Sequence, residues 1–153
     1  MIQATLCFVF NDQWHILLCM KKRGFGEGKR NGAGGKQTEW ESIEQTAKRE
    51  FLEETWVEIS IDNIVKQWVL HFYRPHKPEW NQTVHVFVWI SFIWEPKETE
   101  EMIPKWRSID EIPYNIMRED DIVWLPRLIA WELFEYEFIF DETNKIYSSK
   151  ILL

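Results

Sequence analysis

The sequence predicts a mixed α/β fold organised as a single domain over residues 1–153. Segments with the alternating pattern of β-strands outnumber helical segments, but two helices have clear start signals. The chain has no internal repeat, linker or low-complexity stretch, and its 153 residues suffice for one substantial core. Together these observations predict strands and helices packed in layers, an α/β sandwich.

The N-terminal segment is expected to form a β-hairpin followed by a glycine-rich loop. Residues 2–10 and 14–20 are rich in β-forming side chains, and the Asn-Asp-Gln between them is a turn signal. All six glycines of the chain then lie between Gly24 and Gly35. Glycines confined to one loop indicate backbone that bends tightly or approaches a ligand closely.

A helix is expected soon after this loop. Ser42 is a good N-cap, and Gln45 three residues later completes a capping box. Beyond the helix, the alternation of apolar residues predicts strands at residues 57–61, 64–73 and 84–94.

The C-terminal third is expected to hold a short strand, a second helix and a closing hairpin. The short strand covers residues 106–109, and Asp120 or Asp121 begins a helix that reaches about Phe134. Pro126 fits that helix only within its first turn, because proline lacks the backbone N–H. The closing hairpin is predicted at residues 136–141 and 145–152.

Composition and charge exclude several classes of protein. With 45% apolar and 28% charged residues, the chain has the make-up of an ordinary folded domain. A formal net charge of −7 argues against a nucleic-acid polymer as partner, because no basic stripe is available to release counterions. No apolar segment reaches transmembrane length and no signal-peptide pattern is present, so we expect a cytoplasmic protein without membrane contact. Cys7 and Cys19 lie in apolar runs and are interpreted as reduced core thiols.

The first helix has an unusual distribution of charge. At the helical period of about 100° per residue, Ile43, Ala47 and Phe51 share one side, and Glu50 and Glu54 lie on that same side. Burying unpaired carboxylates is costly, and acidic groups at a helix C-terminus oppose the macrodipole. A bound cation would compensate both penalties. A solvated acidic face with basic partners is the alternative, and the spacing alone does not decide between them.

The loop and helix together resemble the Nudix box, G-x5-E-x7-R-E-U-x-E-E-x-G-U. Gly35, Glu41 and the run Arg49-Glu50-Phe51-Leu52-Glu53-Glu54 agree with it in spacing and at every charged position. The resemblance implies a Nudix-type α/β/α sandwich with a mixed central sheet and a loop–helix–loop. Trp56 stands where the family has glycine, so the helix exit is expected to be remodelled, because left-handed backbone penalises a bulky side chain.

A closer resemblance, to MutT-type members of that family, covers nearly the whole chain. It is carried by Met20-Lys21-Lys22-Arg23-Gly24-Phe25-Gly26, Asn31-Gly32, Val84-His85-Val86-Phe87 and Asp120-Asp121 with Trp124. It implies hydrolysis of oxidised purine nucleoside triphosphates, of the 8-oxo-dGTP type, to the monophosphate and pyrophosphate, with Mg²⁺ as cofactor and Mn²⁺ as a substitute. It also implies three groups of site residues: Glu53, Glu54 and Arg49 in catalysis; Gly35 (through its carbonyl), Glu50, Glu53, Glu54 and Glu101 as metal ligands; and Thr5, Lys21, Phe25, Asn31, Asp120 and Asp121 in the nucleotide pocket.

The chain departs from these relatives at the base-stacking position, where Arg118 stands in place of a Trp. We assign Arg118 to the substrate pocket and expect Asp120 or Asp121 to pair with it. Such a pair would stop both acids from reading the purine edge, so we expect weaker discrimination against ordinary dGTP. Helix capping is the simpler role for the two aspartates.

Simpler roles are also open for other residues in this set. Asn31 is interpreted either as a turn residue or as a pocket amide, and Glu101 can belong to a solvated acidic run. Phe25 is either a core anchor or a platform for the base, and we favour the platform. Arg49 is expected to hold Glu41 or a neighbouring acid in place rather than to touch substrate.

We therefore expect an enzyme that acts on a small nucleotide as a monomer. Glu53 or Glu54 is the general base, and the sequence does not choose between them. Another Nudix activity, on dinucleoside polyphosphates or capped RNA, is the alternative among enzymes, although capped RNA needs basic surface that the net charge disfavours. A nucleotide-binding module with weakened catalysis is the alternative from another class, and the intact Glu50, Glu53 and Glu54 oppose it.

Overall fold

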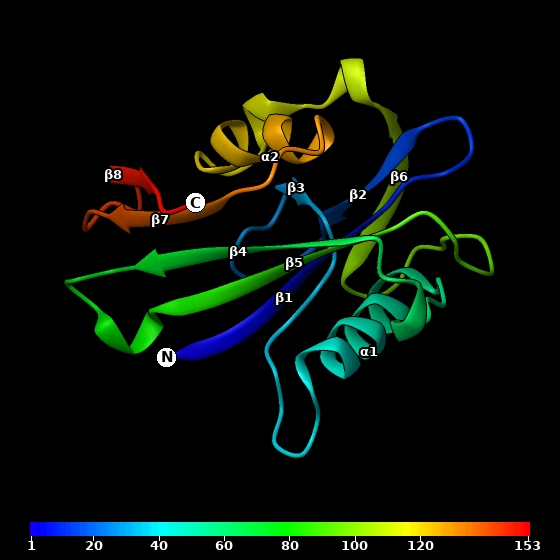
Figure 1. Cartoon of the computed structure of the whole chain (residues 1–153), viewed down its shortest axis with the longest axis horizontal. Helices are drawn as coiled ribbons and strands as arrows, with labels where there is room; N and C mark the ends of the chain where they lie inside the picture. Colours follow the sequence, from blue (N-terminus) through cyan, green and yellow to red (C-terminus); the bar gives the residue numbers. More distant parts are fainter.

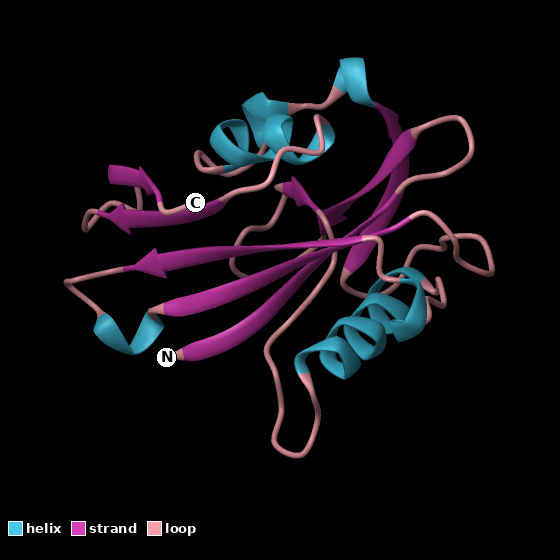
Figure 2. Cartoon of the chain, in the orientation of Figure 1, coloured by secondary structure: helices cyan, strands magenta, loops and turns pink.

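The computed structural model describes all 153 residues and confirms the layered α/β architecture (Figures 1 and 2). A five-stranded mixed sheet has the order β1-β5-β4-β7-β8, and a three-stranded antiparallel sheet has the order β3-β2-β6. No helix is long and apolar enough to cross a membrane. The strands are β1 Ile2–Val9, β2 His15–Lys21, β3 Arg30–Asn31, β4 Lys66–Tyr73, β5 Gln82–Trp89, β6 Met102–Ser108, β7 Glu135–Phe140 and β8 Ile146–Ile151, and the α-helices are α1 Ile43–Thr55 and α2 Asp121–Ile129.

The two helices lie on opposite faces of the sheets, with α1 below and α2 above in Figure 1. Alternate residues of β1 follow this division, because successive side chains of a strand point to opposite faces. Phe8 belongs to the core cluster that contains Trp124 of α2, whereas Cys7 belongs to the cluster that contains Ala47 and Phe51 of α1. The sheet is therefore covered on both sides, and Cys7 is a buried free thiol, as predicted.

The predicted hairpin between the first two strands is wrong. β1 pairs in parallel with β5, and β2 pairs with β6 in the other sheet. A single isolated bridge, between Phe10 and Ile16, joins β1 and β2 at their turn. The remaining edge of β1 is taken by the glycine loop, because Cys7 and Ala33 exchange both backbone hydrogen bonds and Thr5 donates to Gly35. The glycine loop thus takes the edge of β1 that the prediction gave to β2. The alternating pattern of a strand does not show which segment pairs with it.

Several other boundaries differ from the prediction. Residues 57–61 form one isolated bridge, between Glu58 and Ile93, followed by a short 3-10 turn, rather than a strand. The short strand predicted at residues 106–109 is the end of the longer β6. The strands predicted at 64–73 and 84–94 correspond to β4 and β5, and the closing hairpin, β7 with β8, is confirmed.

The second helix is shorter than predicted and contains proline beyond its first turn. α2 ends at Ile129, and Phe134 lies beyond it as a core residue just before β7. Pro126 lies in the second turn, where its missing N–H leaves the carbonyl of Ile122 without the usual helical donor. Ile122 is exposed, so this carbonyl lies on the solvent side of the helix.

α1 begins as predicted but ends differently. The Ser42 hydroxyl accepts from the Gln45 N–H (3.1 Å), and the Gln45 side chain accepts from the Ser42 N–H (2.7 Å), which completes the capping box. The expected remodelling at Trp56 is wrong. Trp56 takes a left-handed conformation, with φ 67°, and donates its N–H to the Leu52 carbonyl (2.9 Å). The backbone thus keeps the cap that a glycine would form, despite the bulky side chain.

Candidate active site

The glycine loop lies directly against β1 and the acidic end of α1. The Gly35 carbonyl accepts from the Thr5 N–H (2.8 Å), and the Gly34 N–H donates to a carboxylate oxygen of Glu54 (2.8 Å). A β-carbon on Gly34 would collide with the Thr5 backbone, and one on Gly35 would collide with the Glu50 carboxylate. Two of the glycines therefore allow close approach, Gly34 to the β1 backbone and Gly35 to the Glu50 carboxylate.

Burial raises the pKa of two carboxyls at the end of α1, and Glu54 makes no ion pair. Glu54 is 6% exposed, and its burial raises the pKa of its carboxyl to about 7, although the Gly34 hydrogen bond opposes the rise. Burial likewise raises the pKa of Glu50, with Arg49 opposing it. The last turn of α1 has no basic residue. The penalties expected from the sequence are present in the structure, and Glu54 lies on the buried side as predicted.

Arg49 organises the acids around the helix. Its Nη2 and Nε donate to the two carboxylate oxygens of Glu41 (2.7 and 3.0 Å), and its Nη1 donates to Glu50 (2.9 Å). These bonds, with a further one from the Thr46 hydroxyl, hold the pKa of Glu41 well below its usual range. The expected contact of Arg49 with Glu41 or a neighbouring acid is present, and it includes both Glu41 and Glu50.

The Arg49 guanidinium also orients the side chains of Glu50 and Glu53. Arg49 also reaches Glu53 at 3.5 Å, and Glu53 is the most exposed of its partners, with 58% of its side chain accessible. Because Glu50 and Glu53 are directed at Arg49, no three acidic, histidine or cysteine side chains converge on one point. The set of donors nevertheless suits a hard divalent cation, which prefers carboxylate and carbonyl oxygens.

Glu101 differs from the acidic residues next to it. Glu98 and Glu100 pair with Lys22 and Arg23, as a solvated run would. Glu101 has no such partner, and its negative charge contributes to the raised pKa of both Glu50 and Glu54. It therefore acts electrostatically on the end of α1, where the resemblance places it.

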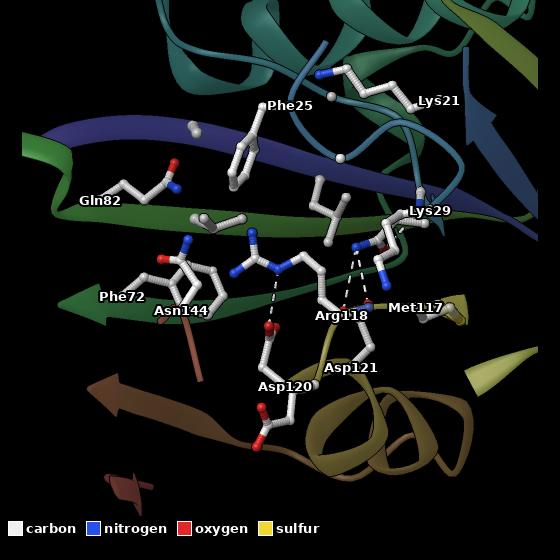
Figure 3. A pocket seen from close by; sticks show the side chains of 18 of the residues that line it. Lys21, Phe25, Lys29, Phe72, Gln82, Met117, Arg118, Asp120, Asp121 and Asn144 are labelled. Atoms are coloured by element: carbon white, nitrogen blue, oxygen red, sulfur yellow. Dashed lines mark hydrogen bonds and ion pairs between the residues drawn. The ribbon is translucent and has the colours of Figure 1, made fainter. Parts of the chain in front are cut away.

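A cavity of about 900 Å³ opens beside this centre, and Figure 3 shows it from close by. Its size is in the range of sites that hold small ligands. Its lining includes Gly35 and every residue that the sequence assigned to the nucleotide pocket: Thr5, Lys21, Phe25, Asn31, Arg118, Asp120 and Asp121.

The two aspartates do not cap α2 in the simple way. Asp120 makes no side-chain capping bond; its carboxylate accepts from Arg118 Nε (3.0 Å) and Trp124 Nε1 (2.9 Å). Asp121 accepts from the Arg118 N–H (2.9 Å) and the Asn31 amide (3.3 Å). The expected pair with Arg118 is thus confirmed for Asp120. Burial and the Asp120 charge raise the pKa of Asp121 well above its usual value, which favours a neutral carboxyl.

The Arg118 guanidinium lies near the rings of Phe72 and Phe140. Figure 3 shows it between Phe25 and Phe72, and its central carbon lies 5.2 Å from the Phe72 ring centre. Phe25 is 70% exposed and lines the cavity, so it is not a core anchor. An Arg and a Phe facing a cavity both offer flat surfaces to a base.

The sequence reasoning missed several lining residues. Arg74, Gln82, Asn144 and the rings of Phe72 and Phe140 all face the cavity. They come from β4, β5, β7 and nearby turns, and they meet only because β4 lies between β5 and β7. One signal was available: Arg74 continues the buried alternation of β4, in which Phe72 precedes it on the same face.

Comparisons with known proteins agree with this geometry. The family described as NUDIX domain matches residues 2–136. The chain is 41% identical over 144 residues to a mouse (Mus musculus) protein named oxidized purine nucleoside triphosphate hydrolase, covering 94% of this chain and 90% of that one. The zebrafish (Danio rerio) protein of the same name is 40% identical over 136 residues, covering 89% and 85%.

Solved structures share the fold. A MutT protein from Bacillus halodurans superimposes with a TM-score of 0.81 at 21% identity, covering 99% of this chain and 98% of that one. A bifunctional NMN adenylyltransferase/ADP ribose pyrophosphatase from Francisella tularensis, complexed with AMP and a Mn ion, gives 0.67 at 21% identity over 85% of this chain and 41% of that one.

Proposed function

Because this chain belongs to the Nudix family, we propose that it hydrolyses oxidised or otherwise modified purine nucleoside triphosphates, of the 8-oxo-dGTP type, to the monophosphate and pyrophosphate. It is a Nudix pyrophosphohydrolase that acts on a small nucleotide. The observation that carries the choice of substrate is the cavity, which brings all the assigned pocket residues together beside the carboxylates at the end of α1. We place the activity in one domain, residues 1–153, acting as a cytoplasmic monomer.

Nudix hydrolysis uses a divalent metal ion, and we assign Mg²⁺ to this role, with Mn²⁺ as a substitute. The residues that would hold it are Gly35, through its carbonyl, with Glu50, Glu53, Glu54 and Glu101. Support comes from the carboxyls of Glu50 and Glu54, whose pKa values are raised by burial despite the nearby charges of Arg49 and Lys21. When bound, the cation neutralises phosphate oxygens and so reduces their repulsion of the nucleophile.

The chain's own residues supply the proton transfer and its geometry. Glu53 or Glu54 accepts the proton from the attacking water. Glu53 is the one open to solvent, whereas Glu54 is fixed by the Gly34 N–H. Arg49, held by its bidentate contact with Glu41, donates to Glu50 and reaches Glu53, so we assign it a positioning role.

The cavity holds the nucleotide between its two ends. Lys21 lines it and lies close enough to Glu54 for its charge to lower that carboxyl's pKa, which suits a contact with phosphate. At the other end Phe25 and Arg118 present flat groups to the base, and Asn31, Asp120 and Asp121 line the same region. Thr5 fixes the loop by hydrogen bonding to Gly35.

A nucleotide panel tests the proposal. Pyrophosphate release is measured from 8-oxo-dGTP, dGTP, ATP and a dinucleoside polyphosphate, with and without Mg²⁺. We expect Mg²⁺-dependent release of pyrophosphate and monophosphate from 8-oxo-dGTP at the highest kcat/KM of the panel. Faster cleavage of the dinucleoside polyphosphate would establish the alternative Nudix activity. Tight binding of 8-oxo-dGTP without turnover would establish a binding module.

A further inference from the structure

Two guanidiniums meet in the cavity around a single aromatic ring. Arg74 follows β4 and is 4% exposed; its Nε donates to Asn144 Oδ1 (3.3 Å), and its central carbon lies 4.7 Å from the Phe140 ring centre. The central carbon of Arg118 lies 5.7 Å from the same ring. Figure 3 shows the Arg118 guanidinium reaching towards Asn144 and Gln82.

The protein pairs only one of these two charges with an acid. Arg118 pairs with Asp120, but Arg74 makes no ion pair, and its side chain bonds only to the Asn144 amide. Burial and the charge of Arg118 both lower the pKa of Arg74. The terminal nitrogens of both guanidiniums have no hydrogen-bond acceptor in the protein. These nitrogens border the cavity and are not enclosed by the protein, and the Arg118 side chain is 32% exposed, so acceptor groups of a ligand in the cavity can bind them.

We propose, resting on the function above, that Arg74 and Arg118 select a purine ring rich in carbonyl oxygens. The chemical class is the 2,6-dioxopurine (xanthine-type) nucleoside triphosphate, in which a carbonyl replaces the amino group of guanine and a ring imide ionises near neutral pH. A guanidinium is a rigid fork of donors that matches carbonyl and anionic acceptors. The amino group of guanine is itself a hydrogen-bond donor, so it cannot accept a hydrogen bond from either guanidinium. The reaction that supplies such a substrate is the deamination of a guanine nucleotide.

The test compares three nucleotides in four proteins. kcat/KM is measured for the dioxopurine, 8-oxoguanine and guanine deoxynucleoside triphosphates with wild type, Arg74→Met, Arg74→Lys and Arg23→Met. Arg23 is a matched control, because it is an exposed cation paired with Glu100. Binding of the three monophosphates to each protein is measured in parallel, so that base preference is read without turnover.

We expect wild type to favour the dioxopurine over guanine by about tenfold or more, the value of one charge-assisted hydrogen bond. This preference for the dioxopurine should grow as the buffer changes from mildly acidic to mildly alkaline, because the imide ionises. Arg74→Met should abolish the preference and Arg74→Lys should reduce it. Arg23→Met should leave the preference unchanged. Equal binding of dioxopurine and guanine monophosphates by wild type would overturn the inference. If 8-oxo-dGTP is still hydrolysed in that case, the proposed function stands. If instead the base preference is present but no nucleotide is cleaved, this inference stands and the proposed function fails.

A second and independent observation concerns tryptophan. Six residues other than glycine have a positive φ, and five of them are Trp: Trp14, Trp40, Trp56, Trp94 and Trp131. The sixth is Asn144, a residue type that tolerates this conformation. The other five Trp residues of the chain all have negative φ. Among the residues other than glycine, positive φ is therefore concentrated at tryptophan, which has one of the bulkiest side chains.

Trp14 and Trp131 pack against the core, but packing does not account for the other three. Trp40 is 98% exposed, Trp56 54% and Trp94 58%, so these side chains gain little burial to offset the steric penalty. Trp56 and Trp131 each follow a helix, a place where glycine is the usual residue. The chain also has ten Trp but only six Gly, all in one loop, whereas glycine is ordinarily about 7% of residues.

We infer that the protein made in its own cell carries glycine at these five positions. The codon that specifies them is read there as glycine, while a different codon specifies the five Trp with negative φ. The codon UGA is the natural candidate, since it differs by one base from both UGG for tryptophan and GGA for glycine. Glycine at position 56 would also complete the Nudix box.

Three measurements test this inference. The gene should use one codon at positions 14, 40, 56, 94 and 131 and another at the remaining five Trp positions. Peptide masses of the protein isolated from its own cells should show glycine at the first five; tryptophan there would overturn the inference. In recombinant protein, Trp40→Gly, Trp56→Gly and Trp94→Gly together should raise the melting temperature, whereas Trp68→Gly, at a buried site, should lower it. A lower melting temperature for the triple variant would contradict the steric reasoning.

Discussion

Replacing Glu54 by Gln should stabilise the metal-free protein while it disables the enzyme. The Glu54 carboxyl is 6% exposed, and burial raises its pKa from 4.5 to about 7. A folded state that raises the pKa of an acid binds more protons than the unfolded chain between those two values. The stability of the wild type therefore falls as pH rises from about 4.5 to about 7. Gln has no charge to bury, and its amide oxygen can still accept from the Gly34 N–H.

The size of the effect follows from the same shift. Each pKa unit corresponds to about 1.4 kcal/mol, so ionising Glu54 in the folded protein costs roughly 3 kcal/mol above neutral pH. The free energy of unfolding of Glu54→Gln should equal that of wild type near pH 4.5 and exceed it by roughly 2–3 kcal/mol near pH 8. Below pH 4.5 both chains carry a neutral group at this position.

Urea denaturation in the presence of a chelator measures this difference. Wild type, Glu54→Gln and Glu39→Gln are unfolded at several pH values; Glu39 is an exposed acid of the same loop and serves as the matched control. Adding Mg²⁺ should stabilise wild type and have little effect on Glu54→Gln, because a ligand that binds only the folded state raises its stability. Parallel pH profiles for wild type and Glu54→Gln would refute the claim that this carboxylate is buried without compensation.

Three further changes give expected outcomes. Arg49→Lys loses the two-point contact with Glu41 and should lower kcat by about tenfold or more with little change in KM, the loss expected for one charge-assisted hydrogen bond; an unchanged kcat would remove Arg49 from the positioning role. Arg118→Trp should raise kcat/KM for 8-oxo-dGTP more than for dGTP, with each 1.4 kcal/mol worth about tenfold; equal changes for both would make Arg118 a bystander. Ser42→Ala should lower the free energy of unfolding by about 1 kcal/mol through the lost capping box, as measured in urea.

The helix and its acids were readable from the sequence because they depend on local rules. The capping box at Ser42 and the buried side with Glu54 follow from side-chain type and helical period alone. The contact of Arg49 with Glu41 joins residues eight apart, across the start of one helix, which spacing can also suggest. The spatial cluster of pocket residues followed from resemblance to a family rather than from spacing.

The rest of the site depends on strand pairing, which local patterns do not specify. β1 was assigned to the wrong partner because its free edge is taken by the glycine loop. Arg74 and Asn144 are brought together by the strand order β5-β4-β7-β8. No local sequence motif marks either residue. The steric expectation at Trp56 was wrong, because this residue takes the left-handed cap conformation that glycine usually forms.

The central claim is that the acidic end of α1 catalyses Mg²⁺-dependent hydrolysis, and one measurement tests it most directly. Pyrophosphate release from 8-oxo-dGTP is followed under saturating Mg²⁺ for wild type, Glu53→Gln, Glu54→Gln and the Glu39→Gln control. We expect loss of either catalytic carboxylate to reduce turnover roughly a hundredfold or more, with circular dichroism unchanged and the control fully active. Near wild-type turnover in both Glu53→Gln and Glu54→Gln would contradict the claim and move the catalytic centre elsewhere.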